Sequence, residues 1–189
     1  MRRIYCTFIC LLCMASSMAA FSQSQTATKQ FTVSKVLETD LNHVEHEVVP
    51  AADAMPGDKY AFAPNMGEFK GVRTFAQEAK HIAVWNYRFG AAILQEKTPV
   101  DTGGESGPDS LNSKAEIMRF LSDSFAYLHK AILSIDEKNL IVPIKSPWGG
   151  EPVTRLGMAA FGIAHPYDEY GQMVEYLRMN GIIPPASRQ

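Results

Sequence analysis

Residues 113–132 read SKAEIMRFLSDSFAYLHKAI. Ser113 and Glu116 have the spacing of a capping box, in which each side chain bonds a free backbone N–H at the start of a helix. Apolar side chains then recur every three or four residues, as they do on one face of an amphipathic helix: Ile117, Phe120, Leu121, Phe125, Leu128 and Ile132. The stretch therefore predicts a helix that must bury one side.

Two similar patterns precede it. Residues 74–93 begin with a second capping box, Thr74 and Gln77, and continue with an apolar stripe made of Phe75, Ala79, Ile82, Asn86, Phe89 and Ile93. An earlier stripe consists of Leu37, Leu41, Val44 and Val48. Pro50 is expected either to end that first helix or to kink it toward Ala54, because proline lacks the backbone donor that a helix interior needs.

A fourth helix is predicted from about residue 154 to residue 180. Its expected core stripe is Leu156, Ala160, Ile163, Tyr170, Val174 and Leu177. Gly181 suits a left-handed helix cap, and Pro184 and Pro185 prevent the helix from continuing. No strand is expected, because the only β-like run, residues 141–144, contains Pro143.

Four amphipathic helices of similar length bury one another best as a bundle. The predicted fold class is therefore all-α, a single four-helix-bundle domain over residues 31–189. The connections are long for a bundle and span about 50–73, 97–112 and 135–153. The first and third carry large apolar side chains and are expected to pack on the bundle. The middle one is rich in glycine over residues 101–107 and is expected to be mobile.

The first residues have the parts of a secretory signal peptide: Arg2 and Arg3, an apolar run over 4–14, and then small residues. Residues 1–22 are taken as this signal and 23–30 as a polar tail, with cleavage after Ala19 or Ser22. The alternative is a membrane anchor, for which the run is short. Export predicts a periplasmic or extracellular protein. All three cysteines lie before residue 14, so the mature chain has no thiol for catalysis or for zinc.

Composition limits the partners. The chain has 189 residues, 46% of them hydrophobic and 20% charged, with a formal net charge of −2. Loss of two arginines and no acid with the signal changes that charge to −4. An acidic exported domain is a poor match for nucleic acid or for anionic lipid, so we expect neither nucleic-acid binding nor membrane association after cleavage.

The histidines are the best candidates for chemistry. His165 and Glu169 are four residues apart, so they share one helix face and could chelate a cation, or form a surface hydrogen bond. Proline is disfavoured inside a helix, yet Pro166 lies within the predicted fourth helix, and such exceptions often occur at functional sites. His81 is either a third ligand or a partly buried histidine. His43 and His46, three residues apart beside Glu47, could form a metal pair but are interpreted as part of a solvated face, and His129 is interpreted as a surface residue.

Two segments carry a resemblance to a known family. One is residues 71–83, GVRTFAQEAKHIA, and the other is residues 165–178, HPYDEYGQMVEYLR, followed by NGIIPP at 180–185. Together they resemble the DinB family of bacterial four-helix bundles, over about residues 31–186. Members of that family have one histidine on the second helix and a His-x-x-x-His segment on the last long helix. Here Glu169 stands where the pattern has its last histidine.

The resemblance implies one divalent metal ion, zinc or nickel first and iron as a further option, held by His81, His165 and Glu169. It implies a hydrolase or transferase that uses metal-activated water or substrate, an unidentified small-molecule substrate, and a homodimer. Trp85, Trp148 and Gln172 are expected to line the pocket. The alternative is a non-catalytic bundle that binds a ligand or partner and has lost the metal site at Glu169.

Overall fold

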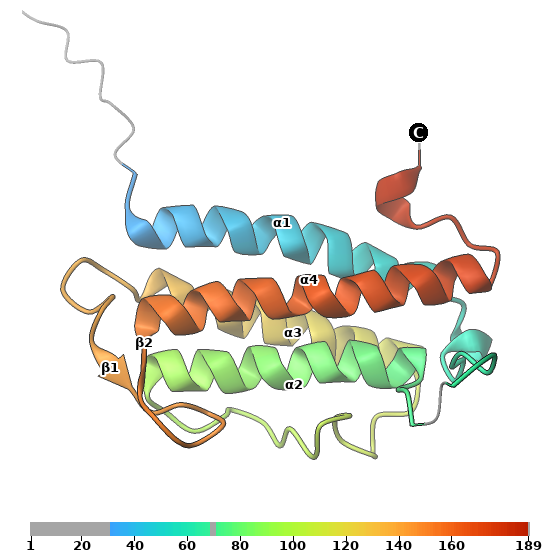
Figure 1. Ribbon diagram of the computed structural model, residues 1–189, viewed down its shortest axis with the longest axis horizontal. Coiled ribbons are helices and arrows are strands. Elements are labelled where there is room, and N and C mark those ends of the chain that lie inside the picture. Colours follow the sequence, from blue (N-terminus) through green and yellow to red (C-terminus); the bar gives the residue numbers. More distant parts are fainter. Residues whose placement is uncertain (1–30, 69–70, 189) are drawn as a thin grey trace, which may run out of the picture. The chain divides into compact units, whose positions relative to one another are not determined.

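Four long helices lie side by side in the computed structural model (Figure 1): α1 (Val33–Ala54), α2 (Phe75–Leu94), α3 (Lys114–Leu133) and α4 (Arg155–Met179). The structure describes residues 31–68 and 71–188, so the predicted signal peptide and polar tail lie outside the described residues. Helices α1 and α2 each pack against both α3 and α4. This arrangement confirms the predicted all-α four-helix bundle.

The two predicted capping boxes are present. The Thr74 hydroxyl accepts from the backbone N–H of Gln77 at 3.2 Å, and the Gln77 side chain accepts from the N–H of Thr74 at 2.8 Å. Ser113 and Glu116 make the same reciprocal pair at the start of α3. Each box satisfies two of the backbone donors that a helix start leaves free, which fixes where α2 and α3 begin.

The core lies between the four helices. Its largest fully buried side chains come mainly from the stripes predicted for the first three helices, among them Leu41, Phe75, Ile82, Phe89, Ile93, Ile117, Leu121, Phe125, Leu128 and Ile132. Burying one such side chain stabilises the fold by roughly 1.5–3 kcal/mol. The bundle therefore owes its stability mainly to these apolar faces.

The stripe predicted for α4 was wrong in its first half. Ala160 is exposed, and Leu156, Ile163 and Tyr170 are only partly buried. The buried face instead consists of Met158, Ala159, Gly162, Pro166, Glu169, Met173, Val174, Tyr176 and Leu177. A glycine, a proline and a carboxylate occupy its middle, so hydrophobic periodicity could not identify this face as the inner one.

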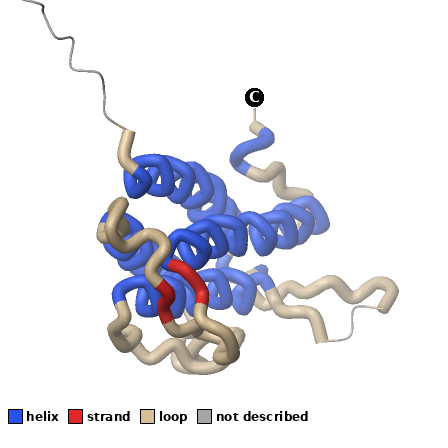
Figure 2. Tube along the Cα trace, turned by 60° about the vertical axis from the view of Figure 1, so that its left-hand side comes forward, coloured by secondary structure: helices blue, strands red, loops and turns tan. Residues whose placement is uncertain are grey.

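Of the two alternatives for Pro50, the structure excludes the first: Pro50 does not end α1, which continues to Ala54. One further feature differs from expectation. A two-residue antiparallel pair, β1 (Pro143–Ile144) and β2 (Val153–Thr154), connects the third long loop to the start of α4 (Figure 2). Strands this short leave no alternating pattern, and Pro143 stands at the first position of its strand, where proline is tolerated.

Within the described residues, no helix combines the length and the apolar character needed to cross a membrane.

Candidate metal centre

Three potential ligands from two helices converge inside the bundle. Nε2 of His81 on α2 lies 3.3 Å from Oε1 of Glu169 on α4, and Nε2 of His165 lies 3.6 Å from the same oxygen. One ligand atom from each of the three residues lies within 4.8 Å of the other two. His81 and Glu169 are only 4% and 5% exposed. The predicted residues are therefore brought together, and a solvated surface pair does not describe them.

The spacing fits a metal ion. Zinc binds nitrogen and oxygen ligands at about 2.0–2.2 Å, so two ligand atoms of one tetrahedral ion lie about 3.3–3.6 Å apart. Both distances to Glu169 Oε1 match that separation. Two imidazoles and one carboxylate also match the donor sets of catalytic zinc and of non-haem iron. The three side chains could thus hold one divalent cation.

His81 is held in one tautomer. Its Nδ1 lies 2.5 Å from the backbone carbonyl oxygen of Glu105, an acceptor that requires a proton on Nδ1. Nε2 is the atom that faces Glu169. In the protonated ring Nε2 donates to that carboxylate, and in the neutral ring it carries the lone pair that a metal ion would take. Metal-binding histidines commonly have such an outer hydrogen bond.

His165 sits in an aromatic surround. Its ring centroid lies 5.6 Å from that of Phe89, 6.1 Å from Trp85 and 6.2 Å from Phe161. Burial in this surround lowers the pKa of His165 to about 4, because the charged imidazolium loses its hydration. The ring is neutral at neutral pH, as a metal ligand must be. Its buried Nδ1 has no hydrogen-bond partner among the described residues.

Glu169 is held as an anion by its neighbours. Burial alone would raise its pKa, but hydrogen bonds with His81 and Glu78, together with nearby histidine charge, outweigh burial and lower the pKa. The pKa of Glu78 moves the opposite way, raised by burial and then by the hydrogen bond with Glu169. Gln172 donates its Nε2 to Oε2 of Glu169 at 2.8 Å. Gln172 thus orients the carboxylate through Oε2 and leaves Oε1 toward the histidines.

Two residues at this centre were not predicted. Glu78 precedes His81 by three residues on α2, so helical spacing could have identified it. Glu105 lies in the 97–112 loop, which was expected to be mobile. Its carboxylate accepts from Nε1 of Trp85 at 3.0 Å and from Arg88 at 2.7 Å. No local pattern relates a loop glutamate to a helix some twenty residues away, so only the fold reveals this anchor.

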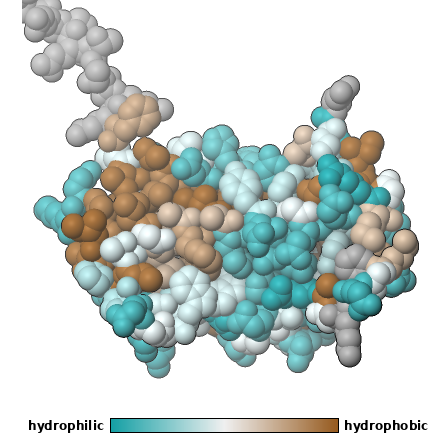
Figure 3. Space-filling model, viewed as in Figure 1, coloured by the Kyte–Doolittle hydropathy of each residue, from teal (hydrophilic) through white to brown (hydrophobic). Residues whose placement is uncertain are grey.

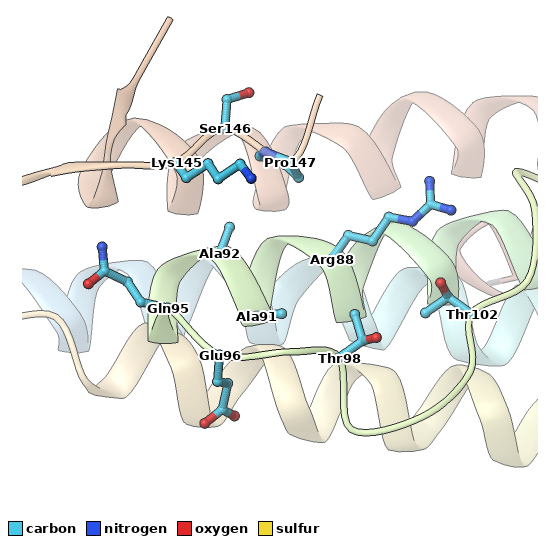
Figure 4. Close-up of a pocket in the computed structure, with 10 residues that line it drawn as sticks. All are labelled: Arg88, Ala91, Ala92, Gln95, Glu96, Thr98, Thr102, Lys145, Ser146 and Pro147. Atoms are coloured by element: carbon cyan, nitrogen blue, oxygen red, sulfur yellow. The ribbon is translucent and has the colours of Figure 1, made fainter. Parts of the chain in front are cut away.

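The predicted lining residues have different roles. Trp85 holds Glu105, and Gln172 holds Glu169. Trp148 packs at 5.6 Å from the rings of both Trp85 and Phe89, and it borders a cavity of about 450 Å³. A second cavity, of about 560 Å³, lies between α2 and the segment 145–147 (Figure 4). Its lining is mostly polar and includes Arg88 and Lys145.

The other histidines lie away from this centre. His43 and His46 are exposed on α1, as predicted. His129 is not a free surface residue: its Nδ1 lies 2.9 Å from Oε2 of Glu38, and its Nε2 lies 2.8 Å from Oε2 of Glu45. Both glutamates belong to α1, two turns apart, and α3 packs against that helix. The prediction failed because it considered only the face of α3 itself.

Comparison with known proteins places the fold in a family. A crystal structure of a DinB-like protein from Bacillus cereus ATCC 10987 is similar, with a TM-score of 0.61 and 16% sequence identity, covering 79% of this chain and 93% of that chain. None of the curated protein sequences matches the chain. The family model of the DinB superfamily matches residues 40–173. Because these residues make up more than half of the chain, the protein belongs to the DinB superfamily.

Proposed function

We propose that this protein binds one divalent metal ion through His81, His165 and Glu169 and acts as a metal-dependent hydrolase or transferase. The observation that carries the proposal is the approach of two imidazole Nε2 atoms to one carboxylate oxygen, at 3.3 and 3.6 Å. Zinc and nickel suit these donors best, and iron is compatible with them.

The residues present supply a prepared ligand set. With both imidazoles neutral, as metal ligands must be, the ligand set carries the one negative charge of Glu169, which partly compensates a dication. Three protein ligands leave room for water or a substrate atom, and a bound ion would polarise that group and lower its pKa. Gln172 donates to Oε2 of Glu169, which leaves Oε1 toward the histidines, and the hydrogen bond with Glu78 helps to keep Glu169 anionic.

The decisive experiment is metal analysis of the purified mature protein after reconstitution with zinc, nickel or iron. We expect one equivalent of metal in the wild type and loss of it in both His81→Ala and His165→Ala. His43→Ala is the matched control, because His43 is an exposed histidine of α1. If no metal binds in any of the three reconstitutions, the proposal fails, and the non-catalytic ligand-binding alternative takes its place.

We also propose that the protein acts outside the cytoplasm. The support is the arginine pair, apolar run and small residues at positions 2–22. Intact-mass measurement of the protein from periplasmic and culture fractions tests this. We expect a new N-terminus after Ala19 or Ser22, and an uncleaved chain retained in the cytoplasm would contradict it.

A further inference from the structure

An apolar cavity of about 450 Å³ adjoins the aromatic side of the metal centre. It is lined by Trp148 and Val153 from the third loop and its short strand, and by Thr154, Gly157, Met158 and Phe161 at the start of α4. No charged side chain is among them. Trp148 and Phe161 are 49% and 46% exposed, and their rings meet edge to face at 5.0 Å. Half-exposed aromatic side chains around a hollow are typical of small-molecule sites.

The surface around this part of the fold is hydrophobic too. Hydrophobic side chains gather over the region where α1 and α4 begin, whereas much of the rest of the same face is polar (Figure 3). A cavity of this size lies within the usual range for small ligands, about 300–1,000 Å³. Its chemistry favours an uncharged apolar group.

One cluster of aromatic side chains lies between the cavity and the metal centre. Phe161 borders the cavity and lies one helical turn before His165, at 6.2 Å between ring centroids. Trp148 also borders the cavity and packs on Phe89, whose ring lies 5.6 Å from that of His165. The two regions are therefore separated by aromatic side chains of the same cluster.

Helix geometry gives the distance between them. Gly157, Phe161, His165 and Glu169 follow one another at intervals of four residues along α4, on a row that turns from the exposed side at Gly157 to the buried side at Glu169. With a rise of 1.5 Å per residue, His165 lies about 6 Å beyond Phe161 and about 12 Å beyond Gly157. A molecule seated in the cavity would therefore have to extend past the Phe161 ring, about 6 Å along the helix, to reach His165.

We infer that the cavity is a substrate subsite for an alkyl or aryl group, and that the substrate joins this group to a metal-binding polar group about 6–12 Å away. The inference rests on the proposed function, because the polar end requires the metal. It narrows the substrate class to amphipathic small molecules and excludes wholly polar ones.

A series of unbranched alkanehydroxamates tests the inference on zinc-loaded protein. The hydroxamate head binds zinc, and the chain grows from acetohydroxamate to decanohydroxamate. Burial of one methylene group favours binding by about fourfold, so affinity should rise by about that factor per carbon once the chain enters the cavity, and level off when the cavity is full. Equal affinity across the series would overturn the inference.

Two phenylalanine substitutions provide the matched comparison. Gly157→Phe places a ring in the cavity, and its Cβ meets only the Thr154 hydroxyl, at 3.1 Å. Gly171→Phe adds the same ring elsewhere on α4, where a Cβ meets nothing within 4 Å. We expect Gly157→Phe to abolish the chain-length dependence but keep the zinc and acetohydroxamate binding. Gly171→Phe should behave like the wild type. If Gly157→Phe does not fold, Trp148→Ala in the third loop takes its place, and we expect affinity to depend less on chain length in that variant.

A probe without a metal-binding group separates the two proposals. Hexan-1-ol binding, followed by saturation-transfer NMR, should occur in zinc-free wild type and in the His81→Ala/His165→Ala double variant, and should be lost in Gly157→Phe. If hexan-1-ol binds but no metal does, the cavity remains an apolar site and the proposed function fails. If metal binds, but hexan-1-ol does not bind and hydroxamate affinity does not change with chain length, the proposed function stands and the subsite is rejected.

Discussion

Nδ1 of His81 lies 2.5 Å from the backbone carbonyl oxygen of Glu105, so a loop residue determines which imidazole nitrogen faces Glu169. The same loop residue is bound by two further side chains of α2. Trp85 and Arg88, one and two turns after His81, both donate to its carboxylate. Arg88 also lies over the Trp85 ring, 4.9 Å from its centroid. The loop and the ligand-bearing helix thus form one unit.

Removing the Glu105 carboxylate should weaken metal binding although Glu105 is not a ligand. In Glu105→Ala the loop loses the carboxylate bonds to Trp85 and Arg88 and keeps the Arg88 bond to the Gly103 carbonyl, so the carbonyl that orients His81 is held less firmly. Outer hydrogen-bond partners of metal ligands typically account for a factor of 10–100 in affinity, so we expect about tenfold weaker zinc binding in competition with a chromophoric chelator. Asp109→Ala, an exposed acid in the same loop, is the control. Unchanged affinity in Glu105→Ala would show that the backbone alone holds the loop.

Gly107 provides an independent test of the loop's position. Its φ is +78°, and a Cβ there would lie 2.7 Å from Cβ of Lys80 on α2. Gly107→Ala therefore combines backbone strain with a steric clash, and we expect a loss of about 1–3 kcal/mol in the free energy of unfolding together with weaker zinc binding. Gly104→Ala should leave both unchanged, since its Cβ meets nothing within 4 Å. Urea denaturation and zinc titration measure the two effects, and equal behaviour of the variants would refute the explanation.

The fold could be predicted from sequence because its determinants are local. Capping boxes at Thr74 and Ser113 and the stripes of α1 to α3 depend only on residues within a few turns of one another. The exception is α4. Gly162 admits the Phe89 ring, with 3.4 Å between its would-be Cβ and Phe89 Cδ2, and Glu169 offers an oxygen that could bind a metal ion. The middle of the inner face of α4 faces the candidate site while both ends pack in the core, so its hydrophobic pattern is misleading.

The site was only partly predictable for a related reason. His165 and Glu169 follow from spacing within one helix. His81 was open to two interpretations from its own helix, a third ligand or a partly buried histidine, and the family resemblance favoured the ligand. Glu105 and the cluster of Glu38, Glu45 and His129 depend on how separate elements pack, which no single-helix pattern records. Residues that join distant segments are therefore those that sequence reasoning missed.

Glu78 should tolerate loss of its acidity but not of its hydrogen bond. Burial and the hydrogen bond with Glu169 raise its pKa, which favours a neutral carboxyl that donates to the anion beside it. Glu78→Gln keeps a donor of the same shape, so we expect zinc affinity close to wild type. Glu78→Ala removes the donor and leaves a cavity at a fully buried position, and should cost about tenfold or more in affinity and 1–3 kcal/mol in stability. Similar losses in both variants would mean that the charge of Glu78 matters.

His129 links two helices through charge. Its two ring nitrogens contact Glu38 and Glu45 of α1 while the residue itself belongs to α3. The hydrogen bond with Glu45 raises the pKa of His129, burial opposes that change, and Glu38 adds to the increase. The native state therefore binds the imidazolium proton more tightly than the unfolded chain does, whose histidines titrate near 6.5.

The stabilisation by this cluster should consequently be full below about pH 6.5 and disappear as the pH rises through the elevated native pKa. We expect His129→Gln to lower the free energy of unfolding by about 0.5–1 kcal/mol at pH 6, the range of partly exposed ion pairs, and by progressively less at higher pH. Urea denaturation of the wild type and of His129→Gln between pH 5.5 and 9 measures this difference. His165, whose lowered pKa changes stability with pH in the opposite direction, contributes equally to both proteins, so its contribution cancels in the difference between their free energies of unfolding. His43→Gln controls for loss of an exposed histidine. A difference that stays constant or grows with pH would mean that packing, and not the ion pairs, connects α3 to α1 at His129.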